Sequence, residues 1–292
     1  MPRILDLDRD QLARLRGRDL TAAVAAAEGR TIVAEVIAGA PGLADGVENF
    51  EIVAAIGADV IILNFVELAL DDTGWRFHEL GPVADLAALA RLVGRPIAVN
   101  LEPGDVPAVR RSTPANARRL VDAGAAMLCL TANPGTGTSL EDLALATAGI
   151  RSELGPDAAI WAGKMHLAGR AEELTATGIE RLVAAGADGV LIPLPGTVPG
   201  ITRERAIELV RAAHDGGAIV MGTIGTSQEG ARPSIASTIA LLAKEIGVDA
   251  HHLGDAGIGR VADPDLLYEY SITVRGRRHT WRRMAFGGRR NG

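Results

Sequence analysis

Short apolar runs recur along the chain, and each of them follows a glycine. The glycines stand at positions 29, 57, 94, 124, 155, 186, 217 and 247. Runs such as TIVAEVIAG and ADVIILNFV do not alternate with polar residues, as is typical of parallel strands buried on both faces. The segments between them, such as AEELTATGIERLVAAG, place apolar residues at helical spacing and end at a glycine, where a left-handed cap is common.

This repeat predicts eight βα units over about residues 30–273, and therefore a single α/β domain, a (β/α)8 TIM barrel. A doubly wound open sheet is the alternative, but it rarely has eight such even units. The remaining residues of this 1–286 domain predict an N-terminal helix over about 8–28 and a C-terminal helix and tail. We expect residues 287–292 to be disordered.

The amino-acid composition indicates which class of protein this is. The chain is 48% hydrophobic and 23% charged, which indicates an ordinary globular protein. The N-terminus lacks the apolar core of a signal peptide, and no apolar run approaches the ~18 residues that cross a bilayer. The single cysteine, Cys129, lies in an apolar run and is expected to be a buried thiol. We therefore expect a cytoplasmic protein without membrane contact.

The charge pattern bears on partners. A net charge of −6 disfavours nucleic acid as a partner of the body of the protein. The tail RGRRHTWRRMAFGGRRNG could bind it, but we favour a final helix packed by Trp281 and Met284, or a tail that crosses a neighbouring subunit of a homo-oligomer.

Polar side chains stand where the predicted strands end, which is the active-site end of a TIM barrel. Residues two apart on a strand share a side, so Asn100 pairs with Glu102, Thr131 with Asn133, and Lys164 with His166. The first two strands contribute one polar residue each. The predicted catalytic residues are Lys164, His166, Glu102 and Glu35, and the predicted substrate-binding residues at these ends are Asn64, Asn100, Thr131 and Asn133.

Lys164 is one of only two lysines among the 30 basic residues. Arginine stays protonated, whereas a partly desolvated lysine can act as a base or form a Schiff base. Glu102 and Glu35 would then be acid–base or amine-tuning carboxylates, and His166 would donate a proton to a developing oxyanion. The alternatives are a purely structural Glu35–Lys164 ion pair and a solvated Glu102. The second lysine, Lys244, is expected on a helix surface.

The loops after the seventh and eighth strands are the recurrent phosphate site of this fold. Here they are rich in glycine, although tight turns need glycine too. The loop NPGTGTS (133–139) is a second candidate for an anion. The predicted substrate-binding residues in the seventh- and eighth-strand loops are Gly225, Thr226, Ser227, Gly254, Asp255 and Gly257.

A cofactor is not specified by the sequence. Mg²⁺ could be held by Glu35, Glu102, His166 or Asp255, but no spacing defines a ligand set, so the metal ligands stay unknown. His251 and His252 are adjacent, so on a strand only one of them can face the site.

The strings NLEP, NPGTG, GKMH, PLPGTVPGIT, GTSQEGA, HHLGDAG and RGRRHTWRRMA, together with EGRTIVAEV, resemble an uncharacterised family of bacterial TIM-barrel proteins. That family is loosely labelled phosphoenolpyruvate phosphonomutase-like. The resemblance spans nearly the whole chain and implies the barrel fold. The chain departs from true phosphoenolpyruvate mutases, whose strand-end aspartates bind Mg²⁺. Here the second strand ends in Asn64, the third offers Glu102, and the aspartates of DDTG (71–74) lie past the strand.

These observations favour a lyase or isomerase that acts on a small phosphorylated carbonyl compound. Two alternatives stay open. One is a Mg²⁺-dependent enzyme like phosphoenolpyruvate mutase or isocitrate lyase, which EDTA would inactivate. The other is a non-catalytic binding or assembly protein, which would tolerate Lys164→Ala and Glu102→Ala.

Overall fold

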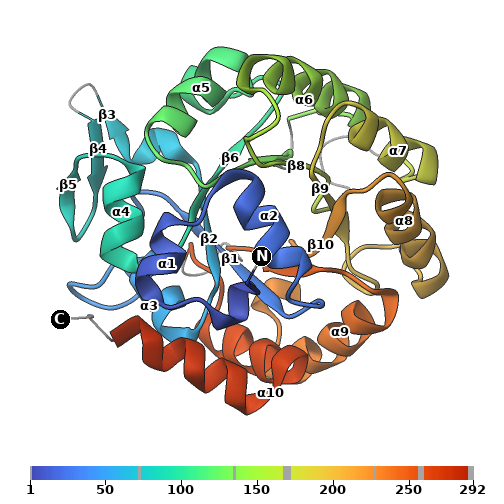
Figure 1. The fold of residues 1–292 in the computed structure, drawn as a ribbon. Helices are drawn as coiled ribbons and strands as arrows, with labels where there is room; N and C mark the ends of the chain where they lie inside the picture. The colour runs from blue at the N-terminus through green and yellow to red at the C-terminus, as the bar shows by residue number, and fades with distance from the viewer. Residues whose placement is uncertain are drawn as a thin grey trace.

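The computed structural model describes residues 2–71, 74–133, 136–166, 172–225, 228–255 and 260–288. Its centre is a closed barrel of eight parallel strands, adjacent in the order β1-β11-β10-β9-β8-β7-β6-β2 (Figure 1). Each strand begins shortly after one of the eight repeated glycines, so the predicted TIM barrel is confirmed. The strands are β1 Thr31–Ile37, β2 Val60–Asn64, β6 Ile97–Leu101, β7 Met127–Leu130, β8 Ile160–Gly163, β9 Gly189–Pro193, β10 Ile219–Ile224 and β11 Ala250–Leu253.

Helices surround the barrel, as the repeat predicts (Figure 1). Val33, Ile62 and Cys129 face the lumen, and the next residues along their strands pack against the helices. No helix in the described ranges combines the length and the apolar character that a bilayer span needs. The surrounding helices are α3 Asn49–Ile56, α4 Leu86–Val93, α5 Pro114–Asp122, α6 Leu140–Leu154, α7 Ala176–Ala184, α8 Arg203–Asp215, α9 Pro233–Ile246 and α10 Pro264–Gly288.

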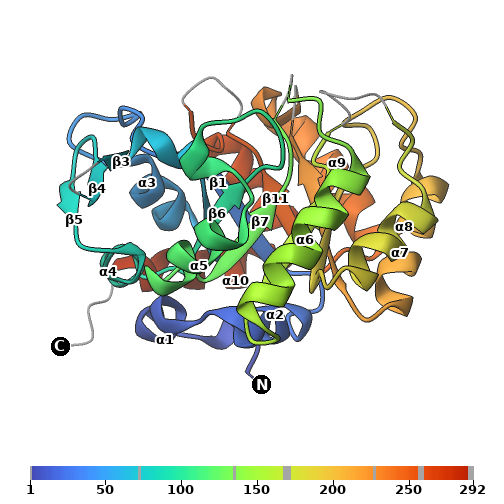
Figure 2. The same ribbon diagram turned by 90° about the horizontal axis from the view of Figure 1, so that it is seen from above.

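The N-terminal segment forms two helices, α1 Arg9–Arg14 and α2 Gly17–Ala25, so the single helix expected over 8–28 was wrong. The break is at Gly17, which has a φ of 58°. Its amide donates to the Ala126 carbonyl at 2.8 Å, and a side chain there would meet the Asp157 carbonyl. The two helices close the N-terminal end of the barrel (Figure 2).

A small antiparallel sheet follows β2 and was not predicted. It consists of β3 Leu70–Asp71, β4 Gly74–Phe77 and β5 Gly81–Val83. Phe77 packs edge-on against Phe50 of α3 at 5.2 Å between ring centroids, which joins the sheet to the barrel. This insertion accounts for the long interval between Gly57 and Gly94.

An aspartate clamp recurs at the N-terminal end of the barrel. Asp59, Asp188 and Asp249 each stand directly before a strand, and each carboxylate accepts a backbone N–H of the neighbouring strand. Each also contacts a basic side chain: Asp188 contacts Arg151 of α6, and Asp249 contacts His214 of α8. The clamp therefore ties adjacent strands together and joins them to the surrounding helices.

The Asp59 clamp explains much of the arginine-rich C-terminal segment. Arg275 and Arg283 of α10 contact the two Asp59 oxygens at 2.6 and 2.7 Å, and all three side chains are buried. Burial raises the pKa of Asp59, but the two guanidinium groups outweigh it and hold that pKa below its ordinary value. The predicted final helix is confirmed as α10, and Met284 is partly buried beside Gly57, but Trp281 is 51% exposed, so its predicted packing was wrong.

Candidate active site

Polar side chains gather at the C-terminal end of one side of the barrel lumen. They come from β11, β1, β2, β6 and β7, and the C-terminal part of these five strands is called the polar side of the lumen. Apolar side chains from all eight strands, among them Trp161, Leu191 and Met221, pack with the N-terminal helices deeper in the lumen. The polar side carries Glu35, Asn64, Asn100, Glu102 and His252, all of them buried.

Glu35 lies at the centre of this polar side. Its Oε2 is 2.8 Å from His252 Nε2, and its Oε1 accepts a hydrogen bond from Asn64 at 2.7 Å. Burial raises the pKa of Glu35, but the bond and charge of His252 and hydrogen bonds with Asn64 and Asp255 outweigh it, so the pKa is lowered. Contacts on both of its oxygens, from Asn64 and His252, therefore hold the pKa of Glu35 below its ordinary value.

His252 settles which of the two adjacent histidines faces the lumen. His251 points the other way, with its ring nitrogens 3.0 Å from the Tyr270 hydroxyl and 2.9 Å from the Gly29 carbonyl. Burial lowers the pKa of His251 to about 4, so that ring is neutral near pH 7. The expectation that the two histidines face opposite sides is confirmed.

Three asparagines connect Glu35 to the second buried acid. Asn64 Oδ1 accepts from Asn100 at 3.0 Å and from Asn133 at 3.4 Å. Asn133 in turn donates its side-chain amide to Glu102 at 2.5 Å and its backbone N–H at 2.6 Å. The chain Glu35–Asn64–Asn133–Glu102 is therefore one continuous hydrogen-bonded network.

Glu102 differs from Glu35 in the direction of its pKa shift. It is fully buried, so the alternative of a solvated loop acid was wrong. Burial raises the pKa of Glu102; Asn133 and Arg110 oppose that shift, the negative charge of Glu35 adds to it, and the pKa stays above its ordinary value. The same network therefore contains one carboxyl group with a lowered pKa, Glu35, and one with a raised pKa, Glu102.

Arg110 covers Glu102 and was not among the residues predicted from the sequence. Its guanidinium lies 3.1 Å from Glu102 and 3.0 Å from Glu67, and 4.2 Å from the centre of the Phe65 ring. Phe65 has a φ of 52°, which is rare for an aromatic residue and costs of order 1–3 kcal/mol. Asn64 Oδ1 accepts the Phe65 N–H at 2.9 Å and so supports this turn.

Some buried polar atoms of the site have no hydrogen-bond partner among the described residues. They include Asn100 Oδ1, Thr131 Oγ1 and His252 Nδ1. An unsatisfied buried polar group costs about 1–3 kcal/mol, so native proteins rarely leave several together. These atoms are available to a ligand.

Lys164 contacts a different part of the molecule. Its Nζ lies 2.6 Å from Glu172 Oε1, and the same oxygen accepts the N–H of Leu140, the first residue of α6, at 2.9 Å. The structure pairs Glu35 with His252 and Lys164 with Glu172, so the structural alternative of a Glu35–Lys164 ion pair was wrong. His166 is buried close to Lys164 in the chain.

The structure describes three of the six residues that were expected to bind phosphate: Gly225, Gly254 and Asp255. Gly225 and Gly254 directly follow β10 and β11, and the Gly254 amide donates to the Ile224 carbonyl at 2.9 Å. Asp255 reaches Glu35, whereas Thr226, Ser227 and Gly257 lie outside the described residues.

Two of the four expected magnesium ligands, Glu35 and Asp255, lie in hydrogen-bond contact. Glu35 is bound to His252 and Asn64, and Glu102 to Asn133. Across the described ranges, no three His, Cys, Asp or Glu side chains form a group that could hold a metal ion. Mg²⁺ is usually held by only one or two carboxylates together with substrate oxygens and water, so a magnesium ion at Glu35 or Asp255 stays a prediction.

Comparisons with known proteins place the chain in a family. The family described as a domain of unknown function (DUF7916) matches residues 5–290, and the chain belongs to it. A search of curated proteins found no match.

Solved structures share the barrel. An archaeal fructose 1,6-bisphosphate aldolase is 15% identical, with a TM-score of 0.54 over 86% of this chain and 96% of that one. The YdjI aldolase from Escherichia coli K12 is 9% identical, with a TM-score of 0.52 over 92% and 94%. A 2,3-dimethylmalate lyase of the PEP mutase/isocitrate lyase superfamily is 17% identical, with a TM-score of 0.51 over 84% and 80%. These likenesses support the TIM-barrel fold, and they do not assign the chain to the phosphonomutase-like group.

Proposed function

We propose that this member of the DUF7916 family is a lyase or isomerase that moves a proton at the carbon beside a carbonyl group, in a small phosphorylated substrate. The observation that carries the proposal is the pair of buried acids. Glu35 and Glu102 share one hydrogen-bonded network, yet their pKa values are moved in opposite directions. Environments that separate two carboxyl groups in this way assign one the role of acid and the other a role in its ionised form.

The proposed proton acceptor is His252. Its Nε2 faces Glu35, and its Nδ1 has no hydrogen-bond partner among the described residues. The step starts from the neutral ring. When Nδ1 takes the proton from the substrate carbon, the Glu35 carboxylate stabilises the imidazolium that forms, and this is the same attraction by which a charged His252 lowers the pKa of Glu35. The electrons of the broken C–H bond then form a carbon–carbon double bond toward the carbonyl carbon.

Glu102 is the proposed proton donor. The carbonyl oxygen of the substrate gains negative charge as the C–H bond breaks, and it takes a proton from Glu102, whose raised pKa favours the protonated form. Asn100 and Thr131 would supply further polar contacts to the substrate. The loops at Gly225 and Gly254, with Thr226, Ser227 and Gly257, are the proposed cradle for the phosphate group.

Hydrogen exchange in D2O tests this proposal without knowledge of the full reaction. The protein is incubated with dihydroxyacetone phosphate and, separately, with pyruvate, and loss of the C–H signal is followed by proton NMR. We expect exchange with wild type and a loss of about 10²–10⁴-fold in Glu102→Gln and in His252→Gln. Lys164→Arg keeps the ion pair with Glu172 and should exchange at the wild-type rate. Exchange in Glu102→Gln at the wild-type rate would contradict the assigned acid.

The imine version of the chemistry rests on Lys164 and has its own test. Borohydride reduction in the presence of a carbonyl substrate links the substrate covalently to a Schiff-base lysine. An adduct at residue 164 that is missing from Lys164→Arg would establish an imine. If wild type exchanges protons but forms no adduct, the acid–base version stands and the imine version falls.

A further inference from the structure

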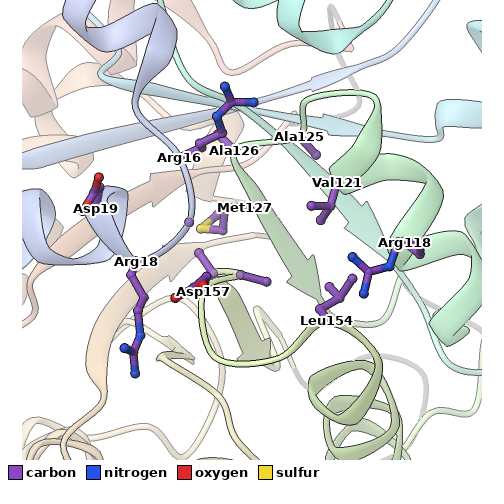
Figure 3. Close-up of a pocket in the computed structure, with 13 residues that line it drawn as sticks. Arg16, Arg18, Asp19, Arg118, Val121, Ala125, Ala126, Met127, Leu154 and Asp157 are labelled. Atoms are coloured by element: carbon purple, nitrogen blue, oxygen red, sulfur yellow. The ribbon is translucent and has the colours of Figure 1, made fainter.

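The two ends of the barrel differ in the polar groups that they offer to a small ligand. A cavity of about 450 Å³ opens at the N-terminal end (Figure 3), where charged side chains of both signs, such as Arg18 and Asp157, are exposed to solvent. None of the described residues that line this cavity has a buried side-chain nitrogen or oxygen without a hydrogen-bond partner. The polar side of the lumen has such atoms on Asn100, Thr131 and His252, so it is the end that selects a ligand by its hydrogen-bonding groups.

The orientation of the Asn64 amide is fixed by its neighbours. Its oxygen accepts the backbone N–H of Phe65 at 2.9 Å, and a backbone N–H can only donate. Its nitrogen donates to Glu35 at 2.7 Å, and an ionised carboxylate can only accept. Asn64 therefore presents its oxygen to Asn100, at a distance of 3.0 Å.

The orientation of the Asn100 amide follows from that of Asn64. The atom of Asn100 that faces the Asn64 oxygen has to be its nitrogen, because two amide oxygens cannot share a hydrogen bond. Asn100 Oδ1 is the atom that is left, and it is buried without a hydrogen-bond partner among the described residues. The lumen residue opposite Asn100 on β7 is Cys129, which makes no hydrogen bond with it. An amide oxygen only accepts, so the ligand group at this position has to be a donor.

Thr131 adds a second requirement. It is buried on the strand beside Glu102, one lumen position beyond Cys129, and its hydroxyl has no partner in the described structure. A ligand hydroxyl can donate to Asn100 and still accept a bond from a group such as Thr131. An ammonium group only donates, and a carbonyl, carboxylate or phosphate oxygen only accepts. A hydroxyl is therefore the group that matches both residues.

We propose that the substrate of this site carries a hydroxyl group on a carbon next to its carbonyl, and that Asn100 selects for this hydroxyl by accepting its hydrogen bond. The proposal rests on the proposed function and narrows its substrate to a phosphorylated hydroxycarbonyl compound, as opposed to a keto acid. Asn100 and Glu102 are two apart on β6 and face the same way, so the hydroxyl can reach Asn100 while the carbonyl oxygen lies at Glu102. The carboxylate of a keto acid would place its oxygens against Asn100 Oδ1.

Two probes that differ by one hydroxyl test the proposal. Dihydroxyacetone phosphate carries a hydroxyl beside its carbonyl, and acetonyl phosphate is the same molecule without that hydroxyl. Isothermal titration calorimetry on the whole protein should show saturable binding of dihydroxyacetone phosphate. Acetonyl phosphate should bind at least about tenfold more weakly, because it leaves Asn100 Oδ1 unpaired. Equal affinities, or no saturable binding of dihydroxyacetone phosphate, would overturn the proposal.

A pair of variants assigns the preference to Asn100. Asn100→Leu removes the acceptor at similar volume, while Asn64 keeps its bond with the Phe65 N–H, and the affinity ratio of the two probes should fall to about twofold or less. Thr31→Val is the matched control, because Thr31 is fully buried at the start of β1 and its oxygen also has no described partner. It should keep the wild-type ratio.

A wild-type ratio in folded Asn100→Leu, or the same loss in both variants, would overturn the assignment. Circular dichroism verifies folding, and if Asn100→Leu does not fold, the two probes on wild type decide. Proton exchange in D2O with the same probes separates this proposal from the proposed function. A preference for the hydroxylated probe without exchange would keep the role of Asn100 and overturn the proton transfer. Exchange of both probes at equal affinity would do the reverse.

Discussion

Two buried charge networks occupy opposite ends of the barrel, and they differ in how completely their atoms are satisfied. At the N-terminal end, Asp59 accepts bonds from Arg275, Arg283 and the backbone of Ile32. The guanidinium of Arg283 also reaches the carbonyl groups of Leu7 and Ile4 at 3.1 and 2.6 Å. This network joins α10, the N-terminal segment and the barrel strands.

The network at the C-terminal end is incomplete. Asn100, Thr131 and His252 each keep a buried polar atom without a hydrogen-bond partner among the described residues, and Phe65 has a strained backbone. Strain and unsatisfied polar groups lower stability and gather at functional sites. The comparison teaches that buried charge alone does not indicate function here. The two networks differ in that the one at the C-terminal end contains buried polar atoms without a hydrogen-bond partner among the described residues.

The largest predicted effect comes from breaking the complete network. Asp59→Ala leaves Arg275 and Arg283 buried without their carboxylate, so we expect a loss of about 3–5 kcal/mol in the free energy of unfolding. Urea denaturation measures it. A loss below about 1 kcal/mol would show that the Asp59 network does not hold the two chain ends to the barrel.

A pair of threonine variants compares the two ends directly. Thr280 Oγ1 lies 2.9 Å from Ser271 Oγ, and both residues are fully buried. Thr280→Val leaves the Ser271 hydroxyl with Arg275 as its remaining partner and should cost about 1–3 kcal/mol. Thr131 Oγ1 has no partner in the described structure, so Thr131→Val should be nearly neutral or stabilising. Equal costs in urea denaturation would contradict the distinction.

The pH dependence of stability should separate the two acids by sign. The lowered pKa of Asp59 gives stability that is present above its ordinary value of 3.8 and is lost as pH falls. The raised pKa of Glu102 gives stability that is present below 4.5 and is lost as pH rises through the folded-state value. As pH rises from 4.5 through the folded-state pKa of Glu102, Glu102→Gln should therefore flatten a decline in unfolding free energy that wild type shows. An unchanged slope would contradict the raised pKa.

The smallest effect is expected at the protein surface beside the Asp59 network. Arg282 lies 3.6 Å from Asp6, and both side chains are well exposed. Arg282→Gln should therefore change the free energy of unfolding by less than about 1 kcal/mol. This variant is the matched control for Asp59→Ala, since it removes a charge from the same end of the barrel without unpairing a buried one.

The sequence by itself determined the barrel and most of the polar cluster. The repeated glycines and unalternating apolar runs require parallel strands covered by helices, and the period-two geometry of a strand places Asn100 with Glu102. These features are local, so they can be read from the order of residues. The small sheet at 70–83 and the break at Gly17 were missed because they depend on contacts with distant segments.

Only the tertiary structure decided which polar residues meet. Lys164 stood out by composition, but its partner Glu172 and the first turn of α6 come from a separate helix and loop. His252 and Arg110 joined the candidate site because the closed barrel brings β11 beside β1, and the loop after β6 over Phe65. Their pKa shifts and ion pairs depend on burial and on distances between segments far apart in the chain, and no local pattern encodes either.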